Sequence, residues 1–349
     1  MAYTSIDNPE LYFQVKTYTG TGSENAITLD GSEDMAPDLV WVKCRSNAEN
    51  HPLHDSVRGA TKTIHPDTTD YEYAVAQGLK SFGSDGFTLG TSNFMNQSGR
   101  TFVAWCWKAG GSSSSNSDGD ITTTISANTT SGISICKYSG NGSNDQELGH
   151  GMNKIPDMWL IKRIDSASSP NWVVGAKPLG FDDNYMFLNT NDAAASSINS
   201  GTGTPTTSVF FVGDHASVNA SGATYISYVF SSVQGFSKVG SYTGNGNNDG
   251  PMVFTGFRPA WVICKGTASN REWVMHDNKR DAENVVDGTL YANTTDAEGT
   301  GTAKMDFLSN GFKLREDGNN WNASGETYVY IAFAEAPFVN SNGVPGNAR

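Results

Sequence analysis

Two histidine–aspartate pairs are the residues of this sequence whose types best suit acid–base chemistry. They are His54-Asp55 and His276-Asp277, which recur at about the same position of an internal repeat. A catalytic pair needs the imidazole and the carboxylate within hydrogen-bond reach. Neighbouring residues of a strand point to opposite faces of the sheet, so adjacency alone does not bring these side chains together. We therefore expect structural polar pairs here, with an active site as the alternative.

Carboxylates offer a second route to catalysis, which is the hydrolysis of glycosidic bonds. A glycosidase needs two carboxyl groups about 5 to 10 Å apart on one concave face. Glu272, Glu298, Glu316 and Glu335 are available near the C-terminus, but no spacing pairs them. The sequence also lacks the G-x-S-x-G, H-E-x-x-H and phosphate-binding glycine motifs. We expect a protein that is not an enzyme, and a glycan depolymerase on a jelly roll is the alternative.

Aromatic rings beside polar loops are the candidate ligand-binding residues. Trp172 and Trp273 stand at matching repeat positions, and Trp321 follows Asn319 and Asn320 in a turn. Indole rings stack on sugars, and asparagine side chains supply hydrogen bonds. Strand tryptophans also serve as core residues, and that alternative applies to Trp172 and Trp273. Trp321 is expected to be exposed, so it is the better candidate for a glycan contact.

Oxygen-rich turns are the candidate calcium ligands. They are Asp118-Gly119-Asp120, Asp182-Asp183-Asn184 and the acidic and amide residues of 316–320. Such residues are also common in ordinary turns, and no complete helix–loop–helix calcium loop is present. We expect no cofactor and no metal, with calcium as the alternative.

The four cysteines lack the spacing of a metal or redox site. Cys44, Cys106, Cys136 and Cys264 form no C-x-x-C motif. Cys106 lies between two tryptophans, and Cys264 follows an apolar run. We expect four buried free thiols.

Charge and hydropathy exclude two classes of partner. The 349 residues carry 23 basic and 36 acidic side chains, a net charge of −13, and no basic run. Nucleic acid is therefore not an expected partner. No apolar run approaches the roughly 20 residues needed to span a bilayer. The first residues lack the pattern of a signal peptide, so we expect a soluble protein made in a cytoplasm.

An internal repeat determines where all these residues lie. A turn followed by an apolar and aromatic strand occurs three times, at residues 96–107, 219–230 and 322–333. A second shared unit begins with proline, continues as an apolar run and ends with lysine, at residues 37–43, 156–162 and 259–265. Proline is tolerated at the first position of a strand. Asp85-Gly86 and Asn310-Gly311, between short apolar runs, predict hairpins.

The repeat length predicts the domain organisation. About 100 residues with seven or eight short strands fit a β-sandwich. We expect an all-β protein of three tandem β-sandwich domains of the concanavalin-like jelly-roll kind. The expected segments are an N-terminal lead (1–11), repeat 1 (12–108), a flexible Gly/Ser linker (109–131), repeat 2 (132–234), repeat 3 (235–338) and a C-terminal tail (339–349). This predicts that repeat 1 is tethered, whereas repeats 2 and 3 share a packed boundary.

Four sequence words resemble a family of tailed-phage virion structural proteins, common in phages of aquatic bacteria. They are Tyr-Thr-Gly-Asn-Gly at 242–246, Gly-Phe-Arg-Pro-Ala-Trp-Val at 256–262, Asn-Ala-Ser-Gly-Glu-Thr-Tyr at 322–328 and Ile-Ala-Phe-Ala-Glu-Ala-Pro-Phe at 331–338. The resemblance covers most of the chain. It implies a virion component with sandwich domains and supplies no catalytic residue.

These observations together predict a non-enzymatic virion protein on the particle surface, in a tail fibre, a tail tip or a capsid decoration. The expected partners are other virion proteins, host-surface polysaccharide and further copies of the chain, with a trimer as the guess. The expected location is the virion, assembled in the cytoplasm of the host bacterium. A purely architectural capsid cement protein is the main alternative.

Overall fold

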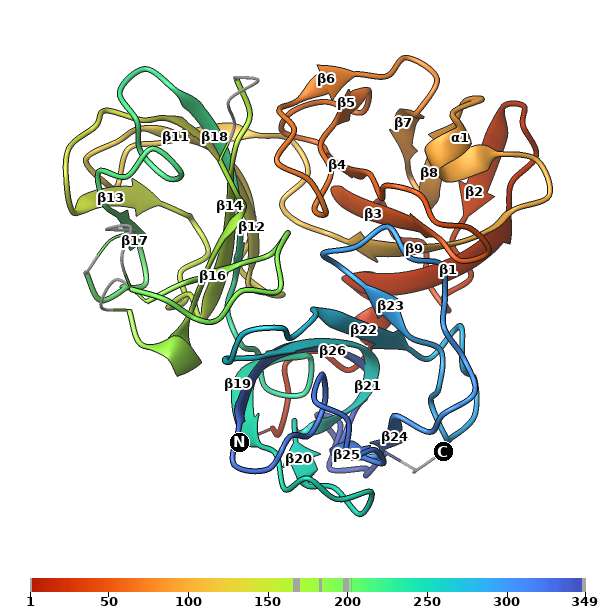
Figure 1. Ribbon diagram of the computed structural model, residues 1–349. Helices are drawn as coiled ribbons and strands as arrows, with labels where there is room; N and C mark the ends of the chain where they lie inside the picture. The colour runs from red at the N-terminus through yellow and green to blue at the C-terminus, as the bar shows by residue number, and fades with distance from the viewer. Residues whose placement is uncertain (1, 166–169, 182–183, 197–200, 202, 347–349) are drawn as a thin grey trace.

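The computed structural model is an all-β protein built from antiparallel sheets, as the sequence predicts. It describes residues 2–165, 170–181, 184–196, 201 and 203–346. Three lobes surround a common centre (Figure 1), and each lobe contains one of the three sequence repeats. No helix in the described part of the chain has the length and apolar character needed to cross a membrane.

Repeat 1 pairs a large sheet with a small one. The large sheet has the strand order β1-β9-β3-β4 and the small one β2-β8-β7, while β5 and β6 form a separate ribbon. The elements are η1 (Pro9–Leu11), β1 (Phe13–Thr19), β2 (Asn25–Thr28), β3 (Leu39–Cys44), β4 (Leu53–Asp55), β5 (Lys62–Thr63), β6 (Tyr73–Ala74), β7 (Leu79–Gly83), β8 (Gly86–Leu89), α1 (Asn93–Asn96) and β9 (Thr101–Trp107).

Repeat 2 has the same plan, with two additional strands at one edge. Its large sheet has the order β10-β11-β12-β18-β14-β15-β16, and its small sheet is the β13-β17 pair. The elements are β10 (Ser114–Asn116), β11 (Thr123–Asn128), β12 (Ile133–Ser139), β13 (Gln146–Gly149), β14 (Met158–Arg163), β15 (Val173–Ala176), η2 (Lys177–Leu179), β16 (Met186–Phe187), β17 (Val209–Val212) and β18 (Thr224–Phe230).

Strands β10 and β11 correct the prediction of a flexible linker at 109–131. Six residues of β11 pair with β12, and the side chain of Ile125 is buried. The Gly/Ser composition indicated freedom, but alternate β-branched residues such as Thr123 and Ile125 fit an open sheet edge.

Repeat 3 completes the set. Its large sheet has the order β19-β26-β21-β22-β23 and its small sheet β20-β25-β24. The elements are β19 (Ser237–Thr243), β20 (Met252–Phe254), β21 (Phe257–Gly266), β22 (Val274–Asp277), β23 (Leu290–Tyr291), β24 (Met305–Leu308), β25 (Gly311–Leu314) and β26 (Thr327–Pro337). The hairpins predicted at Asp85-Gly86 and Asn310-Gly311 are confirmed as β7–β8 and β24–β25.

Two of the repeated sequence words form one local clip. The asparagine that opens each closing turn is buried, and its side-chain oxygen accepts a backbone N–H from the glycine turn of the first strand. The pairs are Asn96 with Thr21 (2.9 Å), Asn219 with Asn141 (2.9 Å) and Asn322 with Asn245 (2.8 Å). A Cβ at the neighbouring Gly20, Gly140 or Gly244 would overlap backbone of the closing turn. The two words therefore recur together because they are in contact.

Side-chain alternation gives each large sheet two buried faces. In β9, Phe102, Ala104 and Cys106 face the small sheet of repeat 1. The alternate residues Trp105 and Trp107 face the other two repeats instead. Corresponding inner cores lie within repeats 2 and 3. This arrangement explains why the closing strands are apolar at nearly every position.

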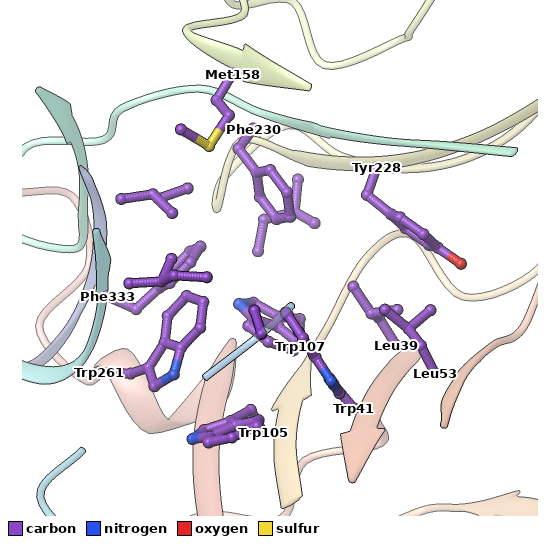
Figure 2. Close-up of a cluster of buried hydrophobic side chains, with 14 of the residues drawn as sticks. Leu39, Trp41, Leu53, Trp105, Trp107, Met158, Tyr228, Phe230, Trp261 and Phe333 are labelled. Carbon is purple, nitrogen blue, oxygen red and sulfur yellow. The ribbon is translucent and has the colours of Figure 1, made fainter. Parts of the chain in front are cut away.

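The outer faces of the three large sheets meet in one shared hydrophobic core. Figure 2 shows Trp107 of repeat 1, Phe230 of repeat 2 and Trp261 of repeat 3 pointing toward one another. Ring centroids of Trp107 and Trp261 lie 5.5 Å apart, and those of Phe230 and Phe333 lie 5.9 Å apart. Repeat 1 is therefore packed as closely as the others, and the predicted loose tether is wrong.

Candidate functional site

The tryptophans predicted to contact glycans are buried. Trp172 and Trp273 are 0 % and 1 % exposed, and each indole N–H donates across a boundary between repeats. Trp172 Nε1 donates to the carbonyl of His65 (3.0 Å), and Trp273 Nε1 donates to that of Phe187 (2.8 Å). Neither ring offers a face to a sugar, which corrects the stacking prediction and favours the core alternative.

Trp321 is also buried, contrary to the prediction from its turn. It is 6 % exposed, and its Nε1 donates to His276 Nε2 at 3.0 Å. Lys304 Nζ lies 4.3 Å from the ring centroid and covers it. Asn320 accepts the backbone N–H of Glu272, so of the five candidates only Asn319 is an exposed side chain. Residues beside a polar turn can still fill a core, and nothing in the local sequence distinguishes the two cases.

The lysine that ends each proline-initiated strand forms the most regular contact between repeats. All three ammonium groups are buried, and each donates to a carbonyl in an equivalent turn of a neighbouring repeat, which follows β23, β5 or β16. The bonds are Lys43 to Thr294 (2.7 Å), Lys162 to Thr69 (3.0 Å) and Lys265 to Thr190 (3.1 Å). Repeat 1 thus contacts repeat 3, repeat 2 contacts repeat 1, and repeat 3 contacts repeat 2.

A backbone hydrogen bond follows the same cyclic order. The donors are the N–H groups of Glu72, Ala194 and Glu298, two residues after the aspartate of each turn. The acceptors are the carbonyls of Ile164 (3.1 Å), Thr267 (2.9 Å) and Arg45 (2.8 Å), in the neighbouring repeat. Head-to-tail contacts of one kind close into a ring when the rotation between units is a simple fraction of a turn. The three repeats therefore form a closed ring within one chain.

These buried lysines give stability a pH dependence. Burial lowers the pKa of Lys162 to about 7 and those of Lys43 and Lys265 to about 8. A lysine in the unfolded chain has a pKa of about 10.4. Above pH 7 the unfolded chain therefore binds more protons than the folded chain, and the free energy of unfolding rises with pH. We expect the free energy of unfolding to increase by about 2 to 3 kcal/mol between pH 7 and 8.5, measured by urea titration.

The control for this experiment is the Lys162→Met variant. Methionine keeps the apolar stem but cannot titrate, so the variant should lose part of the rise. Near the top of that range the buried thiols begin to act in the opposite direction, because burial raises the pKa of Cys136 to about 12, whereas an unfolded thiol titrates near pH ~8.5. A stability that is flat or falls from pH 7 to 8.5 would contradict the expectation.

Buried ion pairs occupy the same place in repeats 1 and 3. Asp55 pairs with Arg58 and Asp277 pairs with Arg280, each at 2.5 Å. Both aspartates also accept a donor from the neighbouring repeat: the Tyr228 hydroxyl bonds Asp55 at 2.7 Å. In the equivalent bond, Trp105 Nε1 donates to Asp277 at 3.1 Å. These contacts link charged groups of one repeat to aromatic groups of the next.

Repeat 2 replaces the whole set with apolar residues. Ala176 and Leu179 stand where repeat 1 has Asp55 and Arg58. The facing residue of repeat 3 is Ile331, which matches Tyr228 in the sequence alignment of the repeats. Replacing both partners of a buried polar contact with apolar residues costs little stability. Replacing only one partner leaves the other buried without a hydrogen bond, which costs more. The boundary between repeats 2 and 3 therefore keeps its packing without a polar network.

The histidines of the His-Asp pairs do not contact their neighbouring aspartates. His54 Nδ1 lies 2.8 Å from the carbonyl of Ala60, and His276 Nδ1 lies 3.1 Å from that of Gly288. Burial lowers the pKa of both imidazoles to about 3, so they are neutral near pH 7. The pairs are structural, because strand alternation sends the two side chains into different cores.

The carboxylates considered for glycosidic hydrolysis have separate partners. Glu272 bonds Asn293, Glu298 bonds Arg45 and Arg280, Glu316 bonds Lys304, and Glu335 bonds Arg258. In the described residues, no three histidine, cysteine or acidic side chains are grouped as a metal site. Asp182 and Asp183 of one predicted calcium turn lie outside those residues. All four cysteines are free and buried, as predicted.

A small apolar cavity lies in the shared core. Its volume is about 30 Å³, and Trp107, Phe230, Trp261 and Phe333 are among its lining side chains. Ligand pockets are typically about ten times larger, so this cavity is a packing defect where three sheets meet.

The candidate binding surface is a groove on the rim of repeat 3. It consists of two adjoining hollows of about 530 and 350 Å³ that share Ser232, Lys238 and Phe254. Strand β19 forms one side and β20 the other, and η2 of repeat 2 approaches β19. Met252 and Phe254 of β20 are 42 % and 57 % exposed. The groove combines apolar groups with two lysines, Lys177 and Lys238, and the carboxylate of Asp157, and it was not predicted from the sequence.

The family comparison places the chain without assigning it an activity. A search of curated proteins found no match. A family model described as a domain of unknown function (DUF7483) matches residues 8–337. Because this match covers nearly the whole ring of three repeats, the chain belongs to the DUF7483 family.

Proposed function

We propose that the protein is a non-enzymatic structural component of a tailed-phage virion, placed on the particle surface. The observation that carries this proposal is the shared core, in which Trp107, Phe230 and Trp261 of three sandwiches pack together. Such packing makes a rigid unit whose repeats cannot move apart without exposing large aromatic side chains. The virion assignment is supported by the sequence words that resemble phage structural proteins.

The absence of catalysis is part of this proposal. It is supported by the separate partners of Glu272, Glu298, Glu316 and Glu335 and by the neutral, buried histidines. We do not extend the proposal to glycan binding by Trp172, Trp273 or Trp321, because their rings are buried. A cement protein and a depolymerase are the competing functions.

Reconstruction of particles from a phage that encodes this protein tests the location. We expect density for the three-lobed ring on the outer surface, at the tail or on the capsid. Density only between capsid subunits would favour the cement alternative, and absence from purified particles would overturn the virion proposal. Native mass spectrometry of the purified chain tests the proposed homo-oligomer, for which a trimer is expected.

Polysaccharide assays test the absence of catalysis separately. Purified protein is incubated with surface polysaccharide of the host, and chain length is followed by size-exclusion chromatography. We expect no shortening. Shortening that persists after repeated purification would overturn the non-enzymatic proposal while leaving the location intact.

A further inference from the structure

The β10–β11 hairpin closes one side of the repeat 2 sandwich. Strand β11 adds antiparallel to β12, with Ile125 opposite Cys136. Ile121 forms a parallel bridge to Leu148 of β13, the neighbouring strand of the small sheet. Thr123 Oγ1 donates to the carbonyl of Gly149 at 2.8 Å. The hairpin therefore spans the opening between the edges of the two sheets.

The equivalent side of repeat 1 is covered by a loop. Gln14 of β1 accepts the N–H of Gly31 at 2.9 Å, and Lys16 pairs with Asp30 at 3.2 Å. Two of the three repeats thus protect this opening with their own chain. Exposed strand edges invite further pairing, so such covers are expected.

In repeat 3 the same opening is the groove between β19 and β20. Both strands are edges of their sheets in the described part of the chain. The N–H of Val239 donates to Ser232 Oγ at 3.0 Å and so points away from β26. Alternation places the N–H and carbonyl of Ser241 on the same outer edge. Beyond a local bridge between Val233 and Ser237, no described strand pairs with this edge.

The floor of the groove is formed by a tyrosine side chain. Tyr330 is only 2 % exposed and lines the groove. It lies across from Gly240, where an added Cβ would come within 2.6 Å of the hydroxyl oxygen. Because Gly240 has no side chain of its own, a residue of an incoming strand opposite Gly240 can cover the tyrosine.

We propose that this groove binds an extended segment of a partner polypeptide, which adds to β19 as β11 adds to β12. The internal precedent sets the chemistry of the segment: an antiparallel strand with an apolar, β-branched residue opposite Gly240, the position that Ile125 occupies opposite Cys136. Main-chain hydrogen bonds supply affinity, and the apolar pocket supplies selectivity. The exposed side chains of Phe254 and Met252 would pack against the apolar face of the partner segment.

Charge narrows the partner further. Lys238 is exposed beside the groove and forms no ion pair with a described residue, whereas Lys177 of η2 lines the groove and pairs with Asp157 at 3.3 Å. In the register of the repeat 2 hairpin, the residue opposite Lys238 stands where Ala127 stands opposite Ser134. An acidic side chain at that position of the partner segment would pair with Lys238.

The test uses a synthetic peptide of residues 115–128 as the probe and the full chain as the receptor. We expect saturable binding by calorimetry and slower amide hydrogen exchange at 237–243. Ser241→Pro should weaken binding by about tenfold or more, because proline removes one ladder donor and obstructs pairing. The matched control is Thr17→Pro at the equivalent position of β1, which should bind like the wild type.

A second variant keeps the test decisive if Ser241→Pro fails to fold. Phe254→Asp changes an exposed side chain and should weaken binding without altering the unfolding midpoint. No binding at millimolar peptide, equal binding by both proline variants, or protection at 133–139 in place of 237–243 would overturn the proposal. So would a dimer of the full chain that Ser241→Pro abolishes, since the occupant would then be a second copy.

Discussion

Replacing Asp55 with alanine is expected to destabilise the folded chain by about 3 to 5 kcal/mol, the usual cost of removing one partner of a buried ion pair. Asp55 is fully buried, and its carboxylate bonds Arg58 at 2.5 Å and the Tyr228 hydroxyl at 2.7 Å. Without it, the guanidinium keeps only Glu72 at 3.5 Å as a carboxylate partner. The measurement is urea unfolding of the wild type and the Asp55→Ala variant at one pH.

The matched control introduces, at the boundary between repeats 1 and 2, the apolar residues found at the boundary between repeats 2 and 3. The variant combines Asp55→Ala, Arg58→Leu, Glu72→Ala and Tyr228→Ile, which copies Ala176, Leu179, Ala194 and Ile331. Because both sides of each contact become apolar, no buried charge is left alone, and much of the lost stability should return. If the combined variant is less stable than Asp55→Ala alone, the apolar residues of the boundary between repeats 2 and 3 cannot replace the polar residues of the boundary between repeats 1 and 2.

Isolating one repeat is expected to abolish cooperative folding. A fragment of residues 235–346 would expose the face that carries Trp261, Ile263, Ile331 and Phe333, all now in the shared core. Exposed apolar faces of this kind associate or collapse without fixed packing. The fragment should bind a hydrophobic dye and unfold without a sharp transition, while the full chain unfolds in one. Circular dichroism against temperature makes this comparison.

The control for the fragment carries Trp261→Gln, Ile263→Thr and Phe333→Thr, which make the exposed face polar. If the missing neighbours are the cause, these changes should reduce dye binding and restore solubility. A wild-type fragment that unfolds sharply near the midpoint of the full chain would show that the sandwiches are independent.

Periodicity and turn chemistry determined the local structure from the sequence. The apolar and aromatic run at 101–107 predicted a strand, and β9 covers those residues. Asp85-Gly86 and Asn310-Gly311 predicted hairpins that the structure contains. Strand alternation predicted that His54 and Asp55 would face different ways. These predictions succeed because backbone geometry and pleating depend on neighbouring residues only.

The contacts between repeats depended on the tertiary structure. Lys43, Lys162 and Lys265 recur visibly in the sequence, yet a lysine at a strand end is normally solvated, and only the ring buries these three. Trp321 follows two asparagines, but Lys304 and His276 from distant segments cover it.

The segment 109–131 follows the same rule, since its order comes from the open edge of β12 and not from its own composition. A period of two residues shows which side chains share a face of a strand, and this could be read from the sequence. What covers the second face of a sheet is decided by chain segments about 100 residues away, so the shared core, the boundaries between repeats and the open groove belonged to the tertiary structure alone.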